Sequence, residues 1–238
     1  MGSTEAEWNV LGHGPIETLA ENLWWVSGDL PGMSLKRNMT VVRLPDGQLV
    51  IHNGIALNPE GMERLERWGT PSVLLVPNGM HRLDAPAYKR RYPALRVLAP
   101  VGSRKKVEQR VAVDGTYDDL PANDTVTLQT LAGTKRLEGA MVVRSADGVT
   151  VVFNDIVFNM DKKTDFLGWA FTTVMGSAPG PRMSRLAKLL LVGDKAVLRG
   201  ELQGLADLPG LTRLIVAHEK VAHGADARAA LVSALGYL

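Results

Sequence analysis

The chain has 238 residues, of which 45% are hydrophobic, and this is enough for one large α/β domain with a sizeable core. The net charge is only +2 and the basic residues are scattered, so the composition gives no support to nucleic-acid binding. The absence of cysteine excludes disulfides, thiolate nucleophiles, zinc–thiolate sites and iron–sulfur clusters. No apolar stretch is long enough for a transmembrane segment and the N-terminus has no apolar signal core, so we expect a soluble, cytoplasmic protein.

The first half of the chain reads as strands and turns, followed by alternating strands and helices. Apolar and β-branched runs predict strands at 22–28, 39–44, 48–52, 72–76 and 96–99. One helix is predicted to begin with Asn58 as N-cap and Pro59 at its first position, and to end at Gly69. A second helix is predicted over 85–92. This alternation favours a βαβ layer.

The second half returns to strands and then becomes largely helical. Strands are predicted at 125–131, 140–144, 149–153 and 211–217, and helices at 166–175, 183–191, 198–205 and 225–238. We expect the apolar helices within 166–191 to belong to the core, with a lipophilic lid or a dimer face as the functional alternative. The whole pattern predicts an α/β fold, a four-layer αββα sandwich. We expect a single domain over 1–238, with a flexible N-terminal segment at 1–14.

Polar side chains follow four of the predicted strands at the point where each strand ends. His52 is the last residue of the strand at 48–52, and Asn78 and His81 follow the strand at 72–76. Asp155 and His218 come directly after two later strands. Because polar groups at strand ends converge at one edge of a sheet, we expect these side chains to share a pocket.

The order and spacing of these residues resemble the metallo-β-lactamase-fold superfamily over nearly the whole chain. That superfamily places a His-x-His-x-Asp-His motif after a buried strand, then a later His, a bridging Asp at another strand end and a final His. The segment 78–83 falls on the main motif, Asp155 on the bridging Asp and His218 on the final His. The turn at 52–54 falls where the superfamily has an Asp-Thr-Gly-like turn. The resemblance implies the same fold and a hydrolase-like activity.

Several ligand positions of the superfamily hold other residues in this chain. Asn78, Met80, Arg82 and Leu83 stand where the main motif has His, His, Asp and His, and no His occurs in 134–139 for the later ligand. Thioether and guanidinium groups are poor zinc ligands, and a positive Arg82 would oppose a second cation. We therefore do not expect a standard two-zinc centre. The chain resembles a branch of the superfamily in which an Asn-x-x-His pattern replaces the motif.

The first functional hypothesis is a one-metal hydrolase that acts on a small ester, lactone or phosphodiester. His81, Asp155 and His218 would hold one zinc, iron or manganese ion, which leaves a coordination position for water. Asn78 would hold the substrate carbonyl or orient that water, and His52 would either support a ligand from behind or carry a proton. The catalytic candidates are thus His52, Asn78 and His81.

Two other hypotheses use the same residues without a metal, and the sequence is equally compatible with the absence of any ion. In one, the chain is a non-catalytic metallo-β-lactamase scaffold that binds a small ligand or a protein partner. In the other, His81 or His52 is a general base and Asp155 orients it. A homodimer is compatible with each hypothesis.

Overall fold

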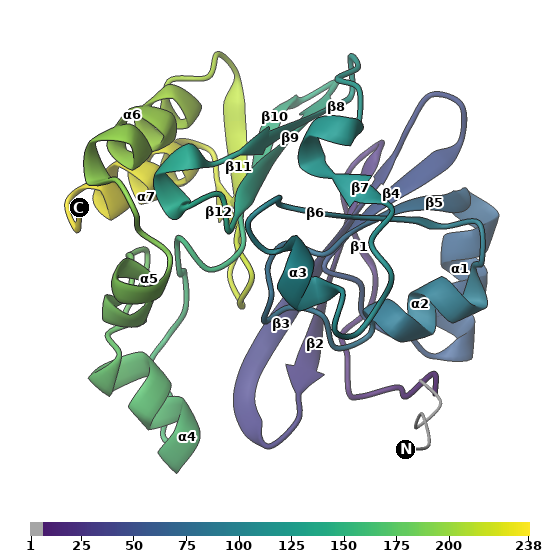
Figure 1. Cartoon of the computed structure of the whole chain (residues 1–238), viewed down its shortest axis with the longest axis horizontal. Helices are drawn as coiled ribbons and strands as arrows, with labels where there is room; N and C mark the ends of the chain where they lie inside the picture. Colours follow the sequence, from purple (N-terminus) through teal and green to yellow (C-terminus); the bar gives the residue numbers. More distant parts are fainter. Residues whose placement is uncertain (1–6) are drawn as a thin grey trace.

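The computed structural model describes residues 7–238, which fold into two β-sheets packed face to face with helices on both outer sides (Figure 1). The first sheet has seven strands in sequence order: β1 (Glu17–Ala20), β2 (Leu23–Leu30), β3 (Met33–Arg43), β4 (Gln48–His52), β5 (Thr70–Leu75), β6 (Arg96–Ala99) and β7 (Gly115–Thr116). Its first four strands are antiparallel, and β4 to β7 are parallel.

The second sheet has five strands in the order β12-β11-β10-β9-β8. They are β8 (Val126–Thr130), β9 (Gly139–Ser145), β10 (Gly148–Val152), β11 (Leu211–Ile215) and β12 (Ala222–His223). The β10–β11 pair is parallel and the other pairs are antiparallel. A parallel pair needs a crossover connection, and here the crossover contains the helices between Asp155 and Leu211.

The helices are α1 (Pro59–Trp68), α2 (Ala85–Arg91), α3 (Arg104–Val107), α4 (Phe166–Trp169), α5 (Arg185–Leu190), α6 (Lys195–Ala206) and α7 (Ala225–Leu235). A π-helical turn, η3 (Ala170–Val174), continues α4, and the 3₁₀ turns η1 (Tyr117–Asp119) and η2 (Ala132–Thr134) lie between β7 and β9. The predicted caps of α1 are present: the Asn58 side chain accepts from the Gly61 N–H at 2.8 Å, and the helix ends at Gly69.

Three apolar layers separate the sheets and helices. The first lies between the sheets and contains Val50 and Ile215, which come from opposite sheets. The second packs α1 and α2 on the seven-stranded sheet, and the third packs α6 and α7 on the five-stranded sheet. Because each sheet buries one face on the other sheet and one face on helices, the molecule is the predicted four-layer αββα sandwich.

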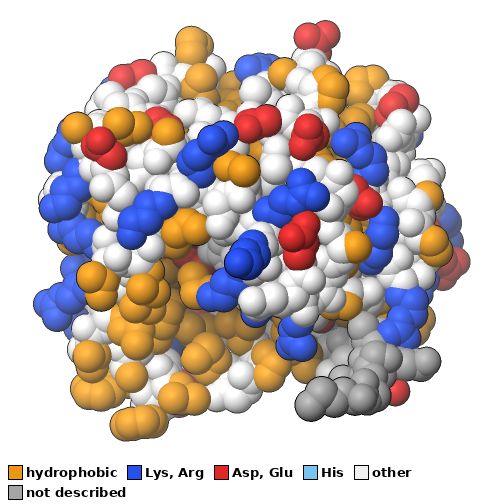
Figure 2. Space-filling model, in the orientation of Figure 1, with side chains coloured by type: hydrophobic (Ala, Val, Ile, Leu, Met, Phe, Trp, Pro, Cys, Tyr) orange, Lys and Arg blue, Asp and Glu red, His pale blue; other side chains and the backbone are white. Residues whose placement is uncertain are grey.

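The segment 166–191 differs from the prediction. The core assignment holds for Met183 and Leu191 but is wrong for several other large apolar side chains, since Phe166 is 77% exposed and Leu189 is 75% exposed. Their side chains belong to an orange area at the lower left of the molecule, where Figure 1 places α4 and α5 (Figure 2). The helical pattern was read correctly, but α4 and α5 stand beside the sandwich rather than within it (Figure 1).

The predicted flexible segment 1–14 is described only from residue 7 onward, and 1–6 lie outside the described residues. The Trp8 indole N–H donates to the Leu57 carbonyl at 2.9 Å, and the Gly14 N–H donates to the Ser27 carbonyl at 2.8 Å. These bonds attach the segment after residue 7 to the seven-stranded sheet and to the loop before α1. Within 7–238, no helix has the length and apolar character needed to cross a membrane.

Candidate functional site

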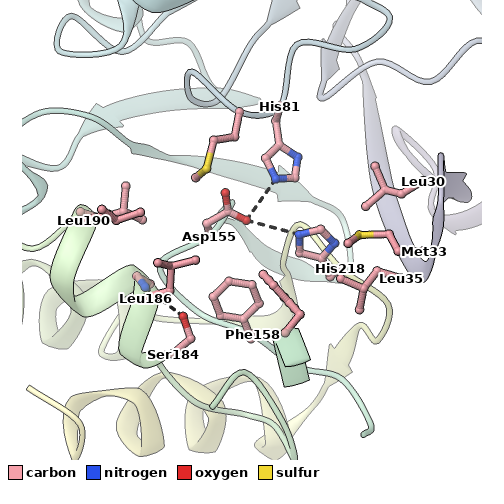
Figure 3. Close-up of a pocket in the computed structure, with 14 residues that line it drawn as sticks. Leu30, Met33, Leu35, His81, Asp155, Phe158, Ser184, Leu186, Leu190 and His218 are labelled. Carbon is pink, nitrogen blue, oxygen red and sulfur yellow. Dashed lines mark hydrogen bonds and ion pairs between the residues drawn. The ribbon is translucent and has the colours of Figure 1, made fainter. Parts of the chain in front are cut away.

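Three of the predicted side chains meet where the carboxyl ends of strands from both sheets come together. His81 lies in the loop after β5, whereas Asp155 and His218 follow β10 and β11 of the other sheet. Figure 3 shows both imidazole rings directed at one oxygen of the Asp155 carboxylate. The parallel pairs β4–β5 and β10–β11 direct these strand ends to the same side of the molecule.

The geometry of this cluster is compact. The Nε2 atom of His81 lies 3.1 Å from Oδ1 of Asp155, and the Nε2 atom of His218 lies 3.4 Å from the same oxygen. One ligand atom from each of the three residues lies within 4.8 Å of the other two. The structure therefore brings together the three residues that the sequence analysis selected as metal ligands.

The orientation of His218 is fixed from the opposite side of its ring. Its Nδ1 lies 2.7 Å from the Lys36 carbonyl, which can only accept a hydrogen bond, so Nδ1 carries the proton. In the neutral ring, Nε2 then has a lone pair directed at the negative Asp155 carboxylate. This arrangement is favourable only when a proton or a cation lies between the two atoms.

The N-terminal half of β3 positions His218 by joining the two sheets. The Asn38 N–H donates to the Ala217 carbonyl at 2.7 Å, and the Asn38 side-chain amide donates to the Val216 carbonyl at 2.8 Å. The sequence predicts this strand only from residue 39, whereas β3 begins at Met33, so neither Asn38 nor the carbonyl of Lys36 was predicted to lie near the site. The extra residues of β3 therefore supply the contacts that hold the end of β11.

Asn78 shapes the loop that carries His81. Its Oδ1 accepts the N–H groups of Met80 at 2.8 Å and His81 at 3.1 Å. Its Nδ2 donates to Glu138 at 2.7 Å and to Oδ2 of Asp155 at 2.8 Å. All four contacts are internal, so the Asn78 amide is engaged in building the site.

Glu138 is a further residue of this site that was not predicted from the sequence. It is fully buried, and its carboxylate also accepts the N–H groups of Asp155 at 3.0 Å and Ile156 at 3.1 Å. The sequence did offer one signal for Glu138: it lies in 134–139, the stretch where the superfamily resemblance implies a metal-binding His. An acidic residue directly before a buried strand needs partners, and here those partners are the elements of the site.

The two buried carboxylates titrate in opposite directions. Burial, and then the negative charge of Asp155, raises the pKa of Glu138 to about 8. Burial also opposes ionisation of Asp155, but His81 and His218 overcome it and hold the pKa of Asp155 well below its usual range. Asp155 is therefore the carboxylate that carries negative charge beside the histidines.

The far end of the His81 loop is anchored by a buried ion pair. Arg37 donates to Oδ2 of Asp84 at 2.6 Å, and the same oxygen accepts the Ala56 N–H at 2.9 Å. Asp84 lies just beyond the superfamily motif and is the residue before α2. The loop is thus fixed by Asn78 at its start and by Asp84 at its end.

A pocket of about 140 Å³ opens over the cluster. Its polar members are His81, Asp155, His218 and Ser184. The remaining lining is apolar and comes from the β2–β3 hairpin, from the loop after β5, from the region of Phe158 and Phe171, and from α5: Leu30, Met33, Leu35, Met80, Phe158, Phe171, Leu186, Ala187, Leu190 and Leu191 (Figure 3).

Two other residues that the sequence singled out, His52 and Arg82, lie outside the cluster. His52 is buried at the end of β4 and does not line the pocket, and its Nε2 has no hydrogen-bond partner among residues 7–238. Burial, and then the nearby charge of His81, lowers the pKa of His52 to about 3. The Arg82 guanidinium donates to the Lys106 carbonyl and to Gln109 Oε1, so its charge is engaged at α3 and not beside the histidines.

The donor set fits a single metal ion. With metal–ligand bonds of about 2.1 Å, two ligands of one ion lie at most about 4 Å apart, so a shift of less than about 1 Å would close the cluster. Two imidazoles and one carboxylate suit zinc, iron or manganese. The group could therefore hold one ion, as the sequence predicts, and the Lys36 carbonyl is the outer partner that a ligating His218 requires.

Comparison with solved structures identifies the fold. A crystal structure of the DIM-1 metallo-β-lactamase exposed to ceftazidime matches with a TM-score of 0.60 and 12% identity, covering 97% of this chain and 100% of that one. A second DIM-1 structure matches with a TM-score of 0.58 and 14% identity, covering 95% and 100%. The chain therefore has the metallo-β-lactamase fold, as the sequence predicts. No protein-family model matches the sequence, and no curated protein sequence matches it.

Proposed function

We propose that the chain is a hydrolase that uses one divalent metal ion, held by His81, Asp155 and His218, to cleave a small ester, lactone or phosphodiester. One observation carries the proposal: two Nε2 atoms converge on a single carboxylate oxygen, at 3.1 and 3.4 Å. The Lys36 carbonyl keeps the His218 lone pair directed at that oxygen. Such an arrangement favours a cation between the two Nε2 atoms and the carboxylate oxygen.

A bound divalent ion would supply a water molecule acidified enough to attack near neutral pH. The chain's own residues prepare the place for it. Asp155 stays ionised, and Asn78 and Glu138 hold its carboxylate and backbone in position. Because the Asn78 amide has four internal hydrogen bonds, we assign it as a positioning residue and not as a contact to the substrate.

The pocket limits the substrate. Apart from the cluster and Ser184 its lining is apolar, and the Ser184 hydroxyl is engaged by the Ala187 N–H at 2.9 Å. A cavity of about 140 Å³ is close to the size that holds one benzene ring, so it takes one ring or a short alkyl group. We therefore propose that an apolar group adjoins the scissile bond, with the polar reacting centre against Asp155.

Metal binding tests the proposal directly. Protein purified without chelator would be analysed for metal content and titrated with Zn²⁺, Fe²⁺ and Mn²⁺, beside His218→Ala, Asp155→Asn and the matched control His223→Ala. We expect one ion per chain, with affinity at least tenfold weaker in the first two variants, roughly the loss expected for a removed ligand or its partner. Equal binding by all variants, or none after added zinc, would contradict the metal site.

One contact favours a second candidate function, a metal-free hydrolase. The His81–Asp155 pair at 3.1 Å is an imidazole oriented by a carboxylate, which is the arrangement of a general base. Hydrolysis of an apolar ester that survives EDTA and is lost in His81→Gln would select this candidate. If the chain neither binds metal nor hydrolyses the ester, the hypothesis of a non-catalytic scaffold would be favoured.

A further inference from the structure

A group of large apolar side chains is exposed on α4, η3 and α5, next to the mouth of the pocket. We call it the α4–α5 apolar surface; its members are Phe166, Leu167, Trp169, Val174, Met175, Leu189 and Leu190. All seven are exposed, within a stretch of 25 residues, and they belong to the largest hydrophobic area visible in Figure 2. Contiguous apolar area of this kind on a folded domain marks a place of contact.

The backbone beneath this surface is held in place by polar side chains. The Asp165 carboxylate accepts the Gly168 N–H at 2.9 Å at the start of α4, and the Thr172 hydroxyl donates to the Gly168 carbonyl at 2.7 Å. Ser184 caps α5 in the same way. The exposed side chains are therefore presented by an ordered scaffold, and their exposure does not result from fraying of a terminus.

The same part of the chain is basic. Residues 161–192 contain five Lys or Arg and two Asp, a net charge of +3, whereas the whole chain carries +2. Asp161 is paired with Lys220 at 2.6 Å, and Asp165 is hydrogen-bonded to Ser34. Arg185 and Lys188 of α5 form no ion pair with any residue in 7–238. The surface thus combines apolar groups with free positive charge.

We propose that the α4–α5 apolar surface docks onto a membrane that contains anionic phospholipid. Exposed Phe, Trp, Leu and Met side chains enter the boundary between head groups and acyl chains, while Arg185 and Lys188 meet the phosphates. A second copy of the chain fits less well, because a two-fold contact through this surface would bring the same basic residues together.

The position of the surface connects the membrane with the pocket. Leu190 belongs to the surface and also lines the pocket, and Leu186 lines it from the previous turn of α5. A molecule with an apolar chain would pass from the bilayer along α5 to the cluster without crossing water. The docking itself needs no metal, so it can be tested independently of the proposed hydrolase activity.

Vesicle co-sedimentation tests the docking on the metal-free full chain. The probes are vesicles of phosphatidylcholine alone and of phosphatidylcholine mixed with phosphatidylglycerol. The variants are Phe166→Ser/Leu189→Ser, Arg185→Glu/Lys188→Glu and the matched control Val197→Ser/Val232→Ser, whose two side chains are each 43% exposed on α6 and α7. Circular dichroism and the Tm establish that each variant is folded.

We expect binding to mixed vesicles, weakened at least about tenfold by the Phe166/Leu189 variant and unchanged by the Val197/Val232 control. The charge variant should weaken binding to mixed vesicles severalfold and leave the weak binding to neutral vesicles unaltered. Absence of vesicle binding, or equal binding by the Phe166/Leu189 variant and the control, would overturn the proposal. The membrane proposal would also be overturned, in favour of self-association, if sedimentation analysis showed a dimer for the original chain and a monomer only for the Phe166/Leu189 variant.

Discussion

Glu138 and Asp155 lie on either side of the Asn78 amide, and the two carboxylates have different surroundings. Glu138 is enclosed: its oxygens accept the Asn78 amide and the N–H groups of Asp155 and Ile156. Asp155 faces outward, and its Oδ1 meets two imidazoles at the floor of an apolar pocket. One carboxylate therefore joins loops together, and the other is available for chemistry.

The difference in pKa follows from this arrangement. Glu138 is pushed toward the neutral acid by burial and by Asp155, and Asp155 is kept ionised by the histidines. Two neighbouring carboxylates whose pKa values are pushed apart are typical of catalytic sites. In this chain the enclosed carboxylate occupies a stretch where the superfamily resemblance led us to expect a metal-binding His. At this stretch the chain instead has a carboxylate that anchors the Asn78 amide and the backbone of Asp155.

The largest effect should come from removing the enclosed carboxylate. Glu138→Ala leaves the Asn78 amide and two backbone N–H groups buried without an acceptor, and we expect it to lower the free energy of unfolding by about 3–5 kcal/mol. Urea denaturation at pH 7 measures this loss. Glu138→Gln is the control, because its amide oxygen keeps part of the acceptor role, and it should lose roughly half as much. Equal losses would mean that the hydrogen bonds do not hold this part of the fold.

Much of the fold was predictable because strand and helix signals are local. The apolar and β-branched runs at 39–44 and 48–52 predicted β3 and β4, and Asn58, Pro59 and Gly69 predicted both ends of α1. The short strands β1, β7 and β12 were missed, since two to four residues carry too little periodicity to recognise. The early start of β3 was missed because Lys36, Arg37 and Asn38 are polar, and the burial of Arg37 and Asn38 depends on partners distant in sequence.

The candidate site was predictable to the extent that its residues follow strands. His81, Asp155 and His218 were selected in this way, and the structure brings them together. Glu138 and the Lys36 carbonyl could not be found by this reasoning, because one precedes its strand and the other is a backbone group. The exposure of Phe166 and Leu189 was also missed, since an amphipathic pattern does not specify whether its apolar face meets a core or a partner.

The buried imidazole of His52 provides a smaller test of the same region. Its pKa is lowered to about 3, so at intermediate acidity the unfolded chain binds a proton there that the folded chain does not. Stability should therefore fall as pH drops below about 6.5, by about 2 kcal/mol from this residue between pH 7 and pH 5. His52→Leu removes the proton site and should flatten the profile by that amount.

Urea denaturation across this pH range measures the effect, with His223→Leu as the control because His223 is exposed on β12. The control should follow the original chain. Parallel profiles for His52→Leu and the original chain would show that His52 titrates normally, and its predicted role as a proton carrier would then regain support.

The smallest expected effect is at Arg82, which stands at a ligand position of the superfamily motif but is directed to α3. Its guanidinium donates to the Lys106 carbonyl and to Gln109, so Arg82→Ala should change the free energy of unfolding by less than about 1 kcal/mol. Metal affinity should change by less than about twofold, whereas the matched loop variant His81→Ala should lower it at least about tenfold. A several-fold gain in affinity for Arg82→Ala would place its positive charge beside the histidines. In that case Arg82, and not only the missing ligands, would be what restricts the site to at most one ion.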